Sequence, residues 1–263
     1  MAQSARPRTG RNFDALRPGY LFNGKIVPLI PYAIRGVIWY QGEANAMAFR
    51  YHHLQLVTLI NDWRARWGAG DFPFAWVQLP SFHAAQKLPV EDSGWVMVCE
   101  NMLKTLALPN TGIAITTDIG EANDIHPKNK QEVGKRLAMW ALADVYRQPG
   151  VAACGPLASG HKIHGSEVTI TFKHADGGLV VKDSELKGFA IAGEDKNWVK
   201  AEAKIAGDTV VVSSPEVKQP VAVRYAWAEN PDCNLYNRAG IPASPFRTDD
   251  WPFRLPQQQT QRP

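Results

Sequence analysis

The residue pattern of this chain changes at Gly150, and that change constrains the fold more than any other feature of the sequence. Before it, short apolar runs alternate with segments whose apolar residues recur every three or four positions. This alternation is typical of strands and amphipathic helices packed in α/β layers. After it, short β-rich segments follow at close intervals, separated by glycine-containing or polar turns. The sequence therefore predicts an α/β region followed by a small antiparallel β-sandwich domain.

Apolar runs and helical periodicity predict the elements of the α/β region. Strands are predicted at 33–40, 74–79 and 112–117, and helices at 47–67, at 95–106, and from Pro127 to about Tyr146. The first strand is expected to be buried on both faces of a parallel sheet, because it is continuously apolar. Pro127 is predicted in the first helical turn, where its missing N–H costs nothing. His52 and His53 point about 100° apart on their helix, so we expect packing or surface roles for them.

Period-two patterning predicts the second region. Strands are expected at 167–172, 179–181, 189–191, 209–213 and 221–226. The predicted organisation is a disordered lead-in at 1–19, the α/β domain at 20–150, the β-sandwich domain at 151–251 and a disordered tail at 252–263. The lead-in is rich in Arg, Gly and Pro and the tail is rich in Gln, which are compositions that do not build a packed core.

Composition excludes several classes of protein. Of the 263 residues, 45% are hydrophobic and 21% are charged, as in ordinary soluble globular proteins. The net charge of +4 is small and the basic residues are scattered apart from a cluster near the start, so no nucleic-acid partner is expected. No run approaches about 18 apolar residues, so no membrane span is expected. The spacing of Cys99, Cys154 and Cys233 fits no zinc or redox motif.

Two polar stretches follow predicted strands and carry the candidate chemistry. Gln41, Glu43 and Asn45 come after the first strand, and Asp124 and His126 come after the third. In open α/β sheets, functional residues collect just beyond the carboxyl ends of the strands. We therefore expect these side chains to face one cleft at that edge. An unperturbed imidazole titrates near pH 6.5, which suits a general base.

The same stretches resemble two hallmark blocks of the sialate O-acetylesterase family, part of the SGNH hydrolase superfamily. Residues 39–45 read Trp-Tyr-Gln-Gly-Glu-Ala-Asn, with Ala44 in place of a Ser, and residues 124–130 read Asp-Ile-His-Pro-Lys-Asn-Lys. The resemblance covers roughly residues 20–251. It implies a partial SGNH-type, flavodoxin-like three-layer fold. It also implies hydrolysis of acetyl esters on sugars by a Ser-His(-Asp/Glu) mechanism that uses neither metal nor cofactor, with an acetylated carbohydrate as substrate.

The resemblance also assigns roles to single residues. His126 is the expected base and Asn45 an expected oxyanion donor. The acid that orients His126 is either Asp124 or Glu43. Asp124 lies two residues before His126 and points the same way in an extended segment, whereas a Glu in the corresponding block is credited with this role in related esterases. Asp124 is our first choice.

Two more residues of the first block have expected roles. Gly42 is expected to let the backbone approach the substrate, since it is also free to take a positive φ. Gln41 is expected to hydrogen-bond a neighbouring loop or the sugar. Members of the family are often periplasmic, extracellular or lysosomal, but the start of this chain lacks the apolar core of a signal peptide, so its compartment is left open.

The nucleophile of the family has no counterpart in this chain. It lies in a Gly-Gln-Ser-Asn block upstream of the Trp-Tyr-Gln-Gly-Glu block, and a further oxyanion loop lies between them. Gln3-Ser4 lacks a preceding strand, and Ala5 replaces the Asn. The sequence therefore predicts the C-terminal portion of an esterase that is inactive by itself. It is either a truncated product, one part of a split protein whose domain an upstream segment completes, or a sequence that starts late.

Two other functions remain open at this stage. The chain could be a non-catalytic carbohydrate-binding remnant of such an esterase. It could instead be a metal-dependent hydrolase that uses Glu43, Asp124 and His126, although catalytic zinc usually has more His ligands. Sequence alone leaves the sugar and the oligomeric state undetermined.

Overall fold

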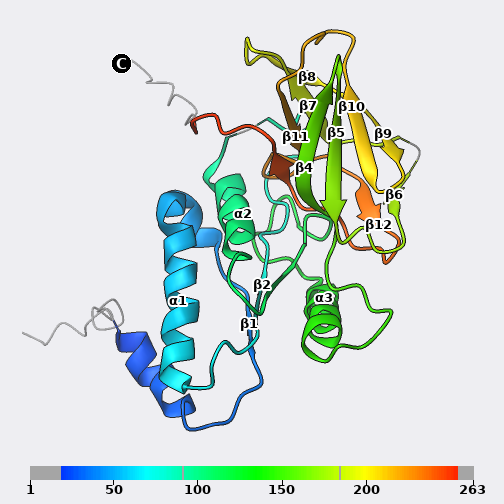
Figure 1. Cartoon of the computed structure of the whole chain (residues 1–263). Helices are drawn as coiled ribbons and strands as arrows, with labels where there is room; N and C mark the ends of the chain where they lie inside the picture. Colours follow the sequence, from blue (N-terminus) through cyan, green and yellow to red (C-terminus); the bar gives the residue numbers. More distant parts are fainter. Residues whose placement is uncertain (1–18, 91, 184, 254–263) are drawn as a thin grey trace, which may run out of the picture.

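A computed structural model describes residues 19–253, except residues 91 and 184. Most of the predicted lead-in (1–19) and tail (252–263), and the Gln3-Ser4 pair, lie outside the described residues. In the described part, an α/β region (19–150) comes first and a β region (151–253) follows (Figure 1). None of the described helices is long and apolar enough to cross a membrane.

A three-stranded parallel sheet forms the centre of the α/β region. Its order is β1 (Val37–Trp39), β2 (Phe74–Val77) and β3 (Thr111–Ala114). All residues of β2 are buried, and successive side chains point to opposite faces. The helices are α1 (His52–Trp67), α2 (Gly94–Thr105) and α3 (Lys130–Trp140), with irregular helical turns at Phe22–Ile26, Val27–Leu29, Glu43–Tyr51 and Ala141–Val145.

The alternation along β2 places helices on both faces of the sheet. Phe74 and Trp76 share one hydrophobic cluster with residues of α1 and α2. Ala75 and Val77 share another with Val133, Leu137 and Trp140 of α3. Burying both faces removes most of the apolar surface of the strand from water. Each Å² of apolar surface buried in this way stabilises the fold by about 25 cal/mol. This central strand is therefore buried from both sides by helices.

The first strand differs from the prediction. Only Val37–Trp39 of the predicted 33–40 is extended, and Ile38 is 66% exposed instead of buried. Val37 and Trp39 pack on the α1 and α2 side, while Ile38 faces the side where α3 packs against β2 and β3. β1 lies at an edge of the sheet, and α3 packs mainly against β2 and β3. No other strand pairs with its free edge within the part of the chain that the structure describes.

Two helix starts also differ from the predictions. The predicted 47–67 helix is divided: a 3₁₀ segment bends at Ala48, and α1 begins only at His52. The last helix begins at Lys130, after Pro127, because the Asn129 side chain accepts the Glu132 N–H and fixes the N-terminus there. An Asn at this position satisfies an amide that would otherwise lack a partner.

The β region contains two four-stranded antiparallel sheets and a two-stranded one. Their orders are β4-β5-β10-β9, β13-β11-β7-β8 and β12-β6. The strands are β4 (Leu157–His164), β5 (Glu167–Lys173), β6 (Leu179–Val181), β7 (Phe189–Ala192), β8 (Trp198–Lys200), β9 (Glu202–Ala206), β10 (Thr209–Ser213), β11 (Ala222–Tyr225), β12 (Leu235–Asn237) and β13 (Phe246–Arg247). All five predicted strands are present.

One hydrophobic cluster joins the two larger sheets. Ile170 and Val210 reach it from one sheet, and Ile191, Val223 and Tyr225 reach it from the other. Alternate residues of β5 and β10 point into this cluster, which is the pattern that the period-two sequence predicted.

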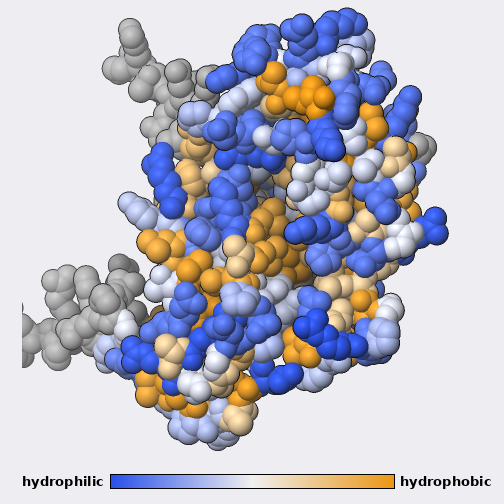
Figure 2. Space-filling view, viewed as in Figure 1, coloured by the Kyte–Doolittle hydropathy of each residue, from blue (hydrophilic) through white to orange (hydrophobic). Residues whose placement is uncertain are grey.

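Buried polar contacts join the β region to the α/β region. Arg224 of β11 donates to Asp92 at 3.0 Å, and Gln78, which follows β2, donates to Ser244 at 2.8 Å. Trp227 belongs to the cluster of β2, α1 and α2. Apolar side chains also gather in a hollow between the two regions (Figure 2). The two regions therefore pack directly on each other.

His52 at the start of α1 should make the stability of the fold depend on pH. Its side chain is 3% exposed, and its Nδ1 has no hydrogen-bond partner within the described residues. Burial, aided by the neighbouring His53, lowers the pKa of His52 from its ordinary value of 6.5 to about 4. Above pH 6.5 the ring is neutral in both the folded and the unfolded state. As the pH falls from about 6.5 to about 4, only the unfolded state takes up the proton, so stability falls.

We expect this effect to reach roughly 3 kcal/mol at pH 4. Urea denaturation between pH 7 and pH 4 measures the unfolding free energy of the wild-type chain and of His52→Gln. The slope of this free energy against pH should be smaller in the variant, by the part that His52 contributes. His161→Gln, on the exposed strand β4, is the control and should keep the wild-type slope. Equal slopes for the wild type and His52→Gln would show that His52 does not titrate in this way.

Candidate active site

The segment after β1 folds into a turn supported by side-chain amides. Gln41 donates to the Asn45 side-chain oxygen at 2.7 Å, and the Asn45 amide nitrogen donates to Gln55 at 2.7 Å. The Asn45 backbone N–H also donates to the Gly42 carbonyl at 3.0 Å. The orientation of the Asn45 amide is therefore fixed from both ends. Because an amide nitrogen carries two N–H groups, one donor remains after the contact with Gln55.

Gly42 contributes close packing in this structure. It is buried, and a Cβ at this position would lie 2.8 Å from Met102 and 3.1 Å from Leu79. Its φ of 161° is extended, so the freedom of glycine to take a left-handed conformation is not used here. The sequence shows a glycine at this position but not why it is there. In the structure, α2 and the loop after β2 lie too close to leave room for a Cβ.

Glu43 is engaged close to its own backbone. Its carboxylate accepts the Gly42 N–H at 2.9 Å. Burial, and then the Glu43 charge, raises the pKa of Tyr40 to about 12. Among the described residues, neither a hydrogen bond nor an ion pair joins Glu43 to His126.

Asp124 and His126 lie together on the loop after β3. The Asp124 carboxylate accepts the His126 backbone N–H at 2.9 Å, and the same oxygen lies 3.6 Å from the ring Nδ1. The distance of 3.6 Å is longer than an N–H···O hydrogen bond. The His126 ring therefore faces the Asp124 carboxylate but does not form a hydrogen bond with it. The His126 side chain is 87% exposed. Its Nδ1 faces Asp124, and Nε2 is therefore directed away from the acid.

Asp124 does not cap the last helix. Asn129 forms the cap of α3 instead, and Asp124 folds its own loop around the His126 amide. Short polar side chains often accept the N–H two residues ahead in such turns. Of the two acids that the sequence left open, the geometry favours Asp124.

A contact between Lys130 and Tyr40 brings the two motifs to the same edge of the sheet. β1 and β3 are both parallel to β2, so the segments after them leave at one edge. The Lys130 ammonium lies 4.5 Å from the centre of the Tyr40 ring, immediately before Gln41. The contact of Lys130 with Tyr40 is a cation–π interaction.

Arg136 anchors the start of the His126 loop, a role that the sequence analysis missed. Its side chain is 3% exposed and makes paired hydrogen bonds to Asp118 at 2.6 and 2.9 Å. It also donates to the Ile115 carbonyl at 2.6 Å. Burial alone would lower the pKa of Arg136, but the hydrogen bonds and charge of Asp118 outweigh burial and raise it. One feature of the sequence could have indicated this role: Arg136 lies on the apolar face of α3, beside Leu137 and Trp140.

Replacing Arg136 by Lys should loosen this loop. A lysine cannot reproduce the planar pair of bonds to Asp118. We expect the unfolding free energy to fall by about 2 to 3 kcal/mol and amide exchange to become faster across residues 118–128. The neighbouring Lys135, 61% exposed and 3.4 Å from Glu132, provides the control. Lys135→Gln should change stability by about 0.5 kcal/mol or less, and a similar loss in both variants would contradict the anchoring role.

Comparisons with known proteins agree with these observations. A family model described as carbohydrate esterase, sialic acid-specific acetylesterase, matches residues 24–143. Sialate O-acetylesterase of Mus musculus is 28% identical over 255 residues, which cover 88% of this chain and 47% of that protein. The Homo sapiens protein of the same name is 27% identical over 255 residues, covering 86% of this chain and 48% of the relative.

A solved structure is also similar. The crystal structure of a novel carbohydrate acetylesterase from Xanthomonas citri has 43% sequence identity and a TM-score of 0.82, and the match covers 88% of this chain and 54% of that one. The mixed α/β architecture with several sheets is thus matched, in sequence and in structure, by proteins described as carbohydrate esterases. These comparisons support the family of sialic acid-specific acetylesterases, the sialate O-acetylesterase family. The chain spans about half the length of the curated relatives that it matches.

Proposed function

We propose that this chain carries the general base and an oxyanion donor of an esterase that removes acetyl groups from carbohydrates. The observation that carries the proposal is the position of the His126 ring, with Nδ1 3.6 Å from Asp124 and 87% of the side chain exposed. An imidazole that is oriented on one side by a carboxylate and open on the other can accept a proton from a nucleophile.

The proposed mechanism assigns one step to each group. His126 Nε2 takes the proton of a serine hydroxyl as its oxygen attacks the acetyl carbonyl, and Asp124 stabilises the resulting imidazolium. The free N–H of Asn45 donates to the oxyanion. Such a donor is worth about 3 to 4 kcal/mol in a well-studied protease. His126 then returns the proton to the departing sugar oxygen. Water releases acetate in the second half of the reaction.

We place the nucleophilic serine on a segment outside the described residues. Within the described part of the chain, Asp124 is the partner that His126 has for hydrogen bonds and ion pairs. Burial raises the pKa of Cys99, Cys154 and Cys233 to about 12, so their thiols are poor nucleophiles. The free edge of β1 and the exposed Ile38 offer a position for a further strand.

The finer architecture is also a proposal. Helices on both faces of the parallel sheet support a partial SGNH-type, flavodoxin-like domain over residues 20–150. Two antiparallel sheets that share one hydrophobic cluster support a β-sandwich domain over residues 151–251. This division follows the change of sequence pattern at Gly150.

Two other functions have different support. A carbohydrate-binding role without catalysis is favoured by an aromatic cavity in the β region, which Trp198 and Trp251 line. A metal-dependent mechanism has less support, because no group of three or more His, Cys, Asp and Glu within the described residues is arranged to hold a metal ion.

An activity assay of residues 1–263 tests the proposed role of His126. We expect hydrolysis of an activated acetyl ester to be equal in the wild-type chain and in His126→Ala, because loss of the nucleophile from a protease triad costs about 10⁶ in kcat. A longer polypeptide that supplies a serine nucleophile to this site should be active, and His126→Ala should inactivate it. Robust turnover by the short chain, abolished in His126→Ala, would place the nucleophile within these residues.

The same active form distinguishes the two candidate acids. We expect Asp124→Asn to lower kcat by about 10⁴, the effect of the equivalent change in a serine protease, with KM nearly unchanged. Glu43→Gln should lower kcat far less, because Glu43 contacts the Gly42 amide and not His126. The reverse order of effects would assign the orienting role to Glu43.

A further inference from the structure

The loop between β2 and α2 contacts both motifs of the candidate active site. β2 is the central strand of the parallel sheet, so this loop leaves the carboxyl edge between the segments that follow β1 and β3. At its start, the His83 N–H donates to the Ala122 carbonyl at 3.0 Å, on the loop that carries His126. At its end, Gly94 lies so close to the Ala46 carbonyl, in the turn after β1, that no Cβ would fit. Exposed side chains of this loop can therefore reach a substrate.

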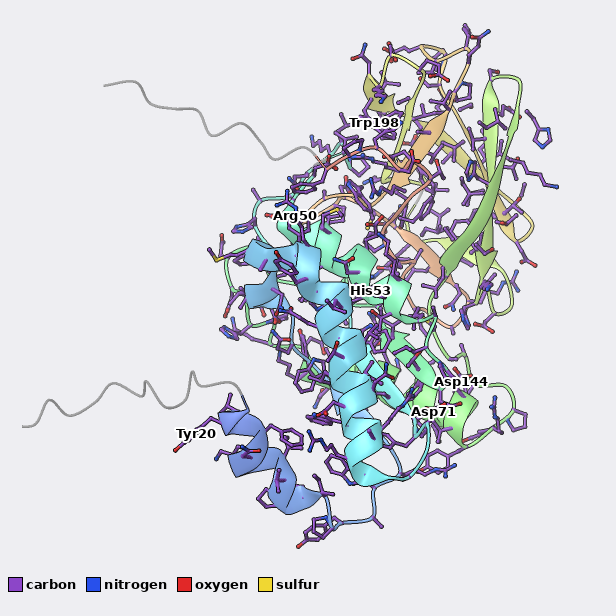
Figure 3. The ribbon with its side chains drawn as sticks, turned by 60° about the vertical axis from the view of Figure 1, so that its left-hand side comes forward. Tyr20, Arg50, His53, Asp71, Asp144 and Trp198 are labelled. Atoms are coloured by element: carbon purple, nitrogen blue, oxygen red, sulfur yellow. The ribbon has the colours of Figure 1, made fainter. Side chains whose placement is uncertain are left out.

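The carboxyl edge of the sheet faces the β region. Asp71 comes shortly before β2 and borders the same cavity as Asp144, so both mark the opposite, amino edge. They lie at the far end of α1 from Arg50, which belongs to the 3₁₀ segment after β1 (Figure 3). Trp198 of the β region lies beyond Arg50, away from the amino edge (Figure 3). The β region is therefore close to the loops that carry the candidate site.

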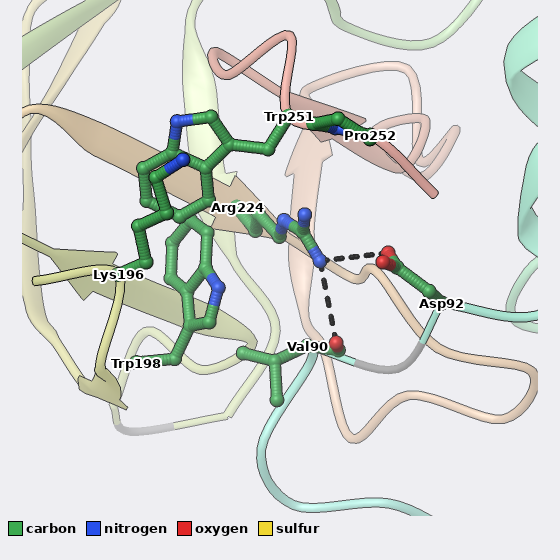
Figure 4. Close-up of a pocket in the computed structure, with 7 residues that line it drawn as sticks. All are labelled: Val90, Asp92, Lys196, Trp198, Arg224, Trp251 and Pro252. Carbon is green, nitrogen blue, oxygen red and sulfur yellow. Dashed lines mark hydrogen bonds and ion pairs between the residues drawn. The ribbon is translucent and has the colours of Figure 1, made fainter. Parts of the chain in front are cut away.

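The β region holds the loop between β2 and α2 at several points. The Arg224 guanidinium donates to the Val90 carbonyl at 3.2 Å and to the Asp92 carboxylate at 3.0 Å (Figure 4). The Gln86 N–H donates to the Asn230 carbonyl at 2.8 Å, and the Gln86 side chain accepts the Asn230 N–H at 3.2 Å. These contacts fix the loop against the turn after β11.

His83 is held in a left-handed backbone conformation on this loop. Its φ is +70°, a region that costs energy for residues other than glycine, although His enters it more often than most. The Ala122 carbonyl accepts its N–H, and its own carbonyl accepts the Asn230 side-chain amide at 2.7 Å. The preceding Phe82 N–H donates to the Glu229 carbonyl at 2.9 Å. Such conformations persist where the surrounding structure fixes them, and they are frequent at functional sites.

The His83 ring is supported on one face and open on its polar edge. Its centre lies 3.9 Å from the centre of the Phe82 ring, which in turn packs 5.4 Å from Trp95. The side chain is 59% exposed, and Nε2 lies 3.5 Å from the Glu229 carboxylate, beyond an ordinary hydrogen bond. Within the part of the chain that the structure describes, neither ring nitrogen of His83 forms a hydrogen bond. The ring is therefore firmly placed, and its nitrogens are available to a ligand.

We propose that His83 is a substrate-binding residue that hydrogen-bonds a hydroxyl of the sugar carrying the acetyl group. The inference rests on the proposed function and adds one residue to it. His126 returns its proton to the departing sugar oxygen, so the sugar lies beside the His126 loop, whereas the acetyl oxygen lies beside Asn45. His83 contacts the His126 loop, and an imidazole can both donate to and accept from a hydroxyl. The β region then acts on the reaction by holding His83 through Glu229 and Asn230.

Kinetics of the active form, in which a longer polypeptide supplies the serine, test the proposal with two kinds of ester. Mono-O-acetylated N-acetylneuraminic acid and mono-O-acetylated glucose carry sugar hydroxyls, and 4-nitrophenyl acetate carries none. His83→Asn removes the imidazole and keeps a residue that tolerates the left-handed conformation. We expect KM for the sugar esters to rise roughly three- to tenfold, the effect of one hydrogen bond. Their kcat, and both constants for 4-nitrophenyl acetate, should stay unchanged.

Two controls accompany this measurement. His161→Asn, on the exposed strand β4, should leave the constants for all esters unchanged. Urea denaturation of residues 1–263 should give the same midpoint for the wild type and for His83→Asn, which shows that the variant folds.

Three outcomes would contradict the inference. An unchanged KM for the sugar esters in His83→Asn would remove the proposed contact while leaving the proposed function intact. An equal loss with the sugar esters and with 4-nitrophenyl acetate would mean that His83 supports the His126 loop and does not bind the sugar. Failure of the wild-type active form to hydrolyse either sugar ester would overturn the proposed function and this inference together.

Discussion

The buried guanidinium of Arg224 is the interaction on which the arrangement of the two regions depends. One nitrogen lies 3.0 Å from Asp92 on the loop before α2, and two others lie 2.9 and 3.0 Å from Asp249 after β13. A charge buried to this degree needs several partners, and removing one partner of such a pair typically costs about 3 to 5 kcal/mol. Arg224 therefore fixes β11, the loop that reaches the candidate active site, and the segment that carries Trp251 to one another.

Much of the fold could be predicted from the sequence because burial leaves a periodic pattern. The strands around Phe74 and Val168 and the helix 95–106 were predicted for this reason. β4 has no such pattern, since almost all of its residues are exposed and only its pairing with β5 makes it a strand. The exposure of Ile38 could not be predicted, because an apolar run does not indicate whether a helix will cover it.

The site was only partly predictable for a related reason. The proximity of Asp124 and His126 follows from their spacing, and the structure places them together. The supporting contacts join distant parts of the sequence: Arg136 binds Asp118, and Gln55 binds Asn45. No local sequence pattern identifies such partners, because the two side chains of each pair become neighbours only when the chain has folded.

The three free thiols, two buried and one partly buried, have a consequence for the chemical durability of the protein. With a pKa of about 12, roughly one thiol in 10⁵ is ionised at pH 7. Oxidation to sulfenic acid and exchange with disulfides both proceed through the thiolate. Cys99, Cys154 and Cys233 should therefore react very slowly with peroxide or oxidised glutathione. With all three cysteines free in the structure, the folded chain would respond little to a change between oxidising and reducing surroundings.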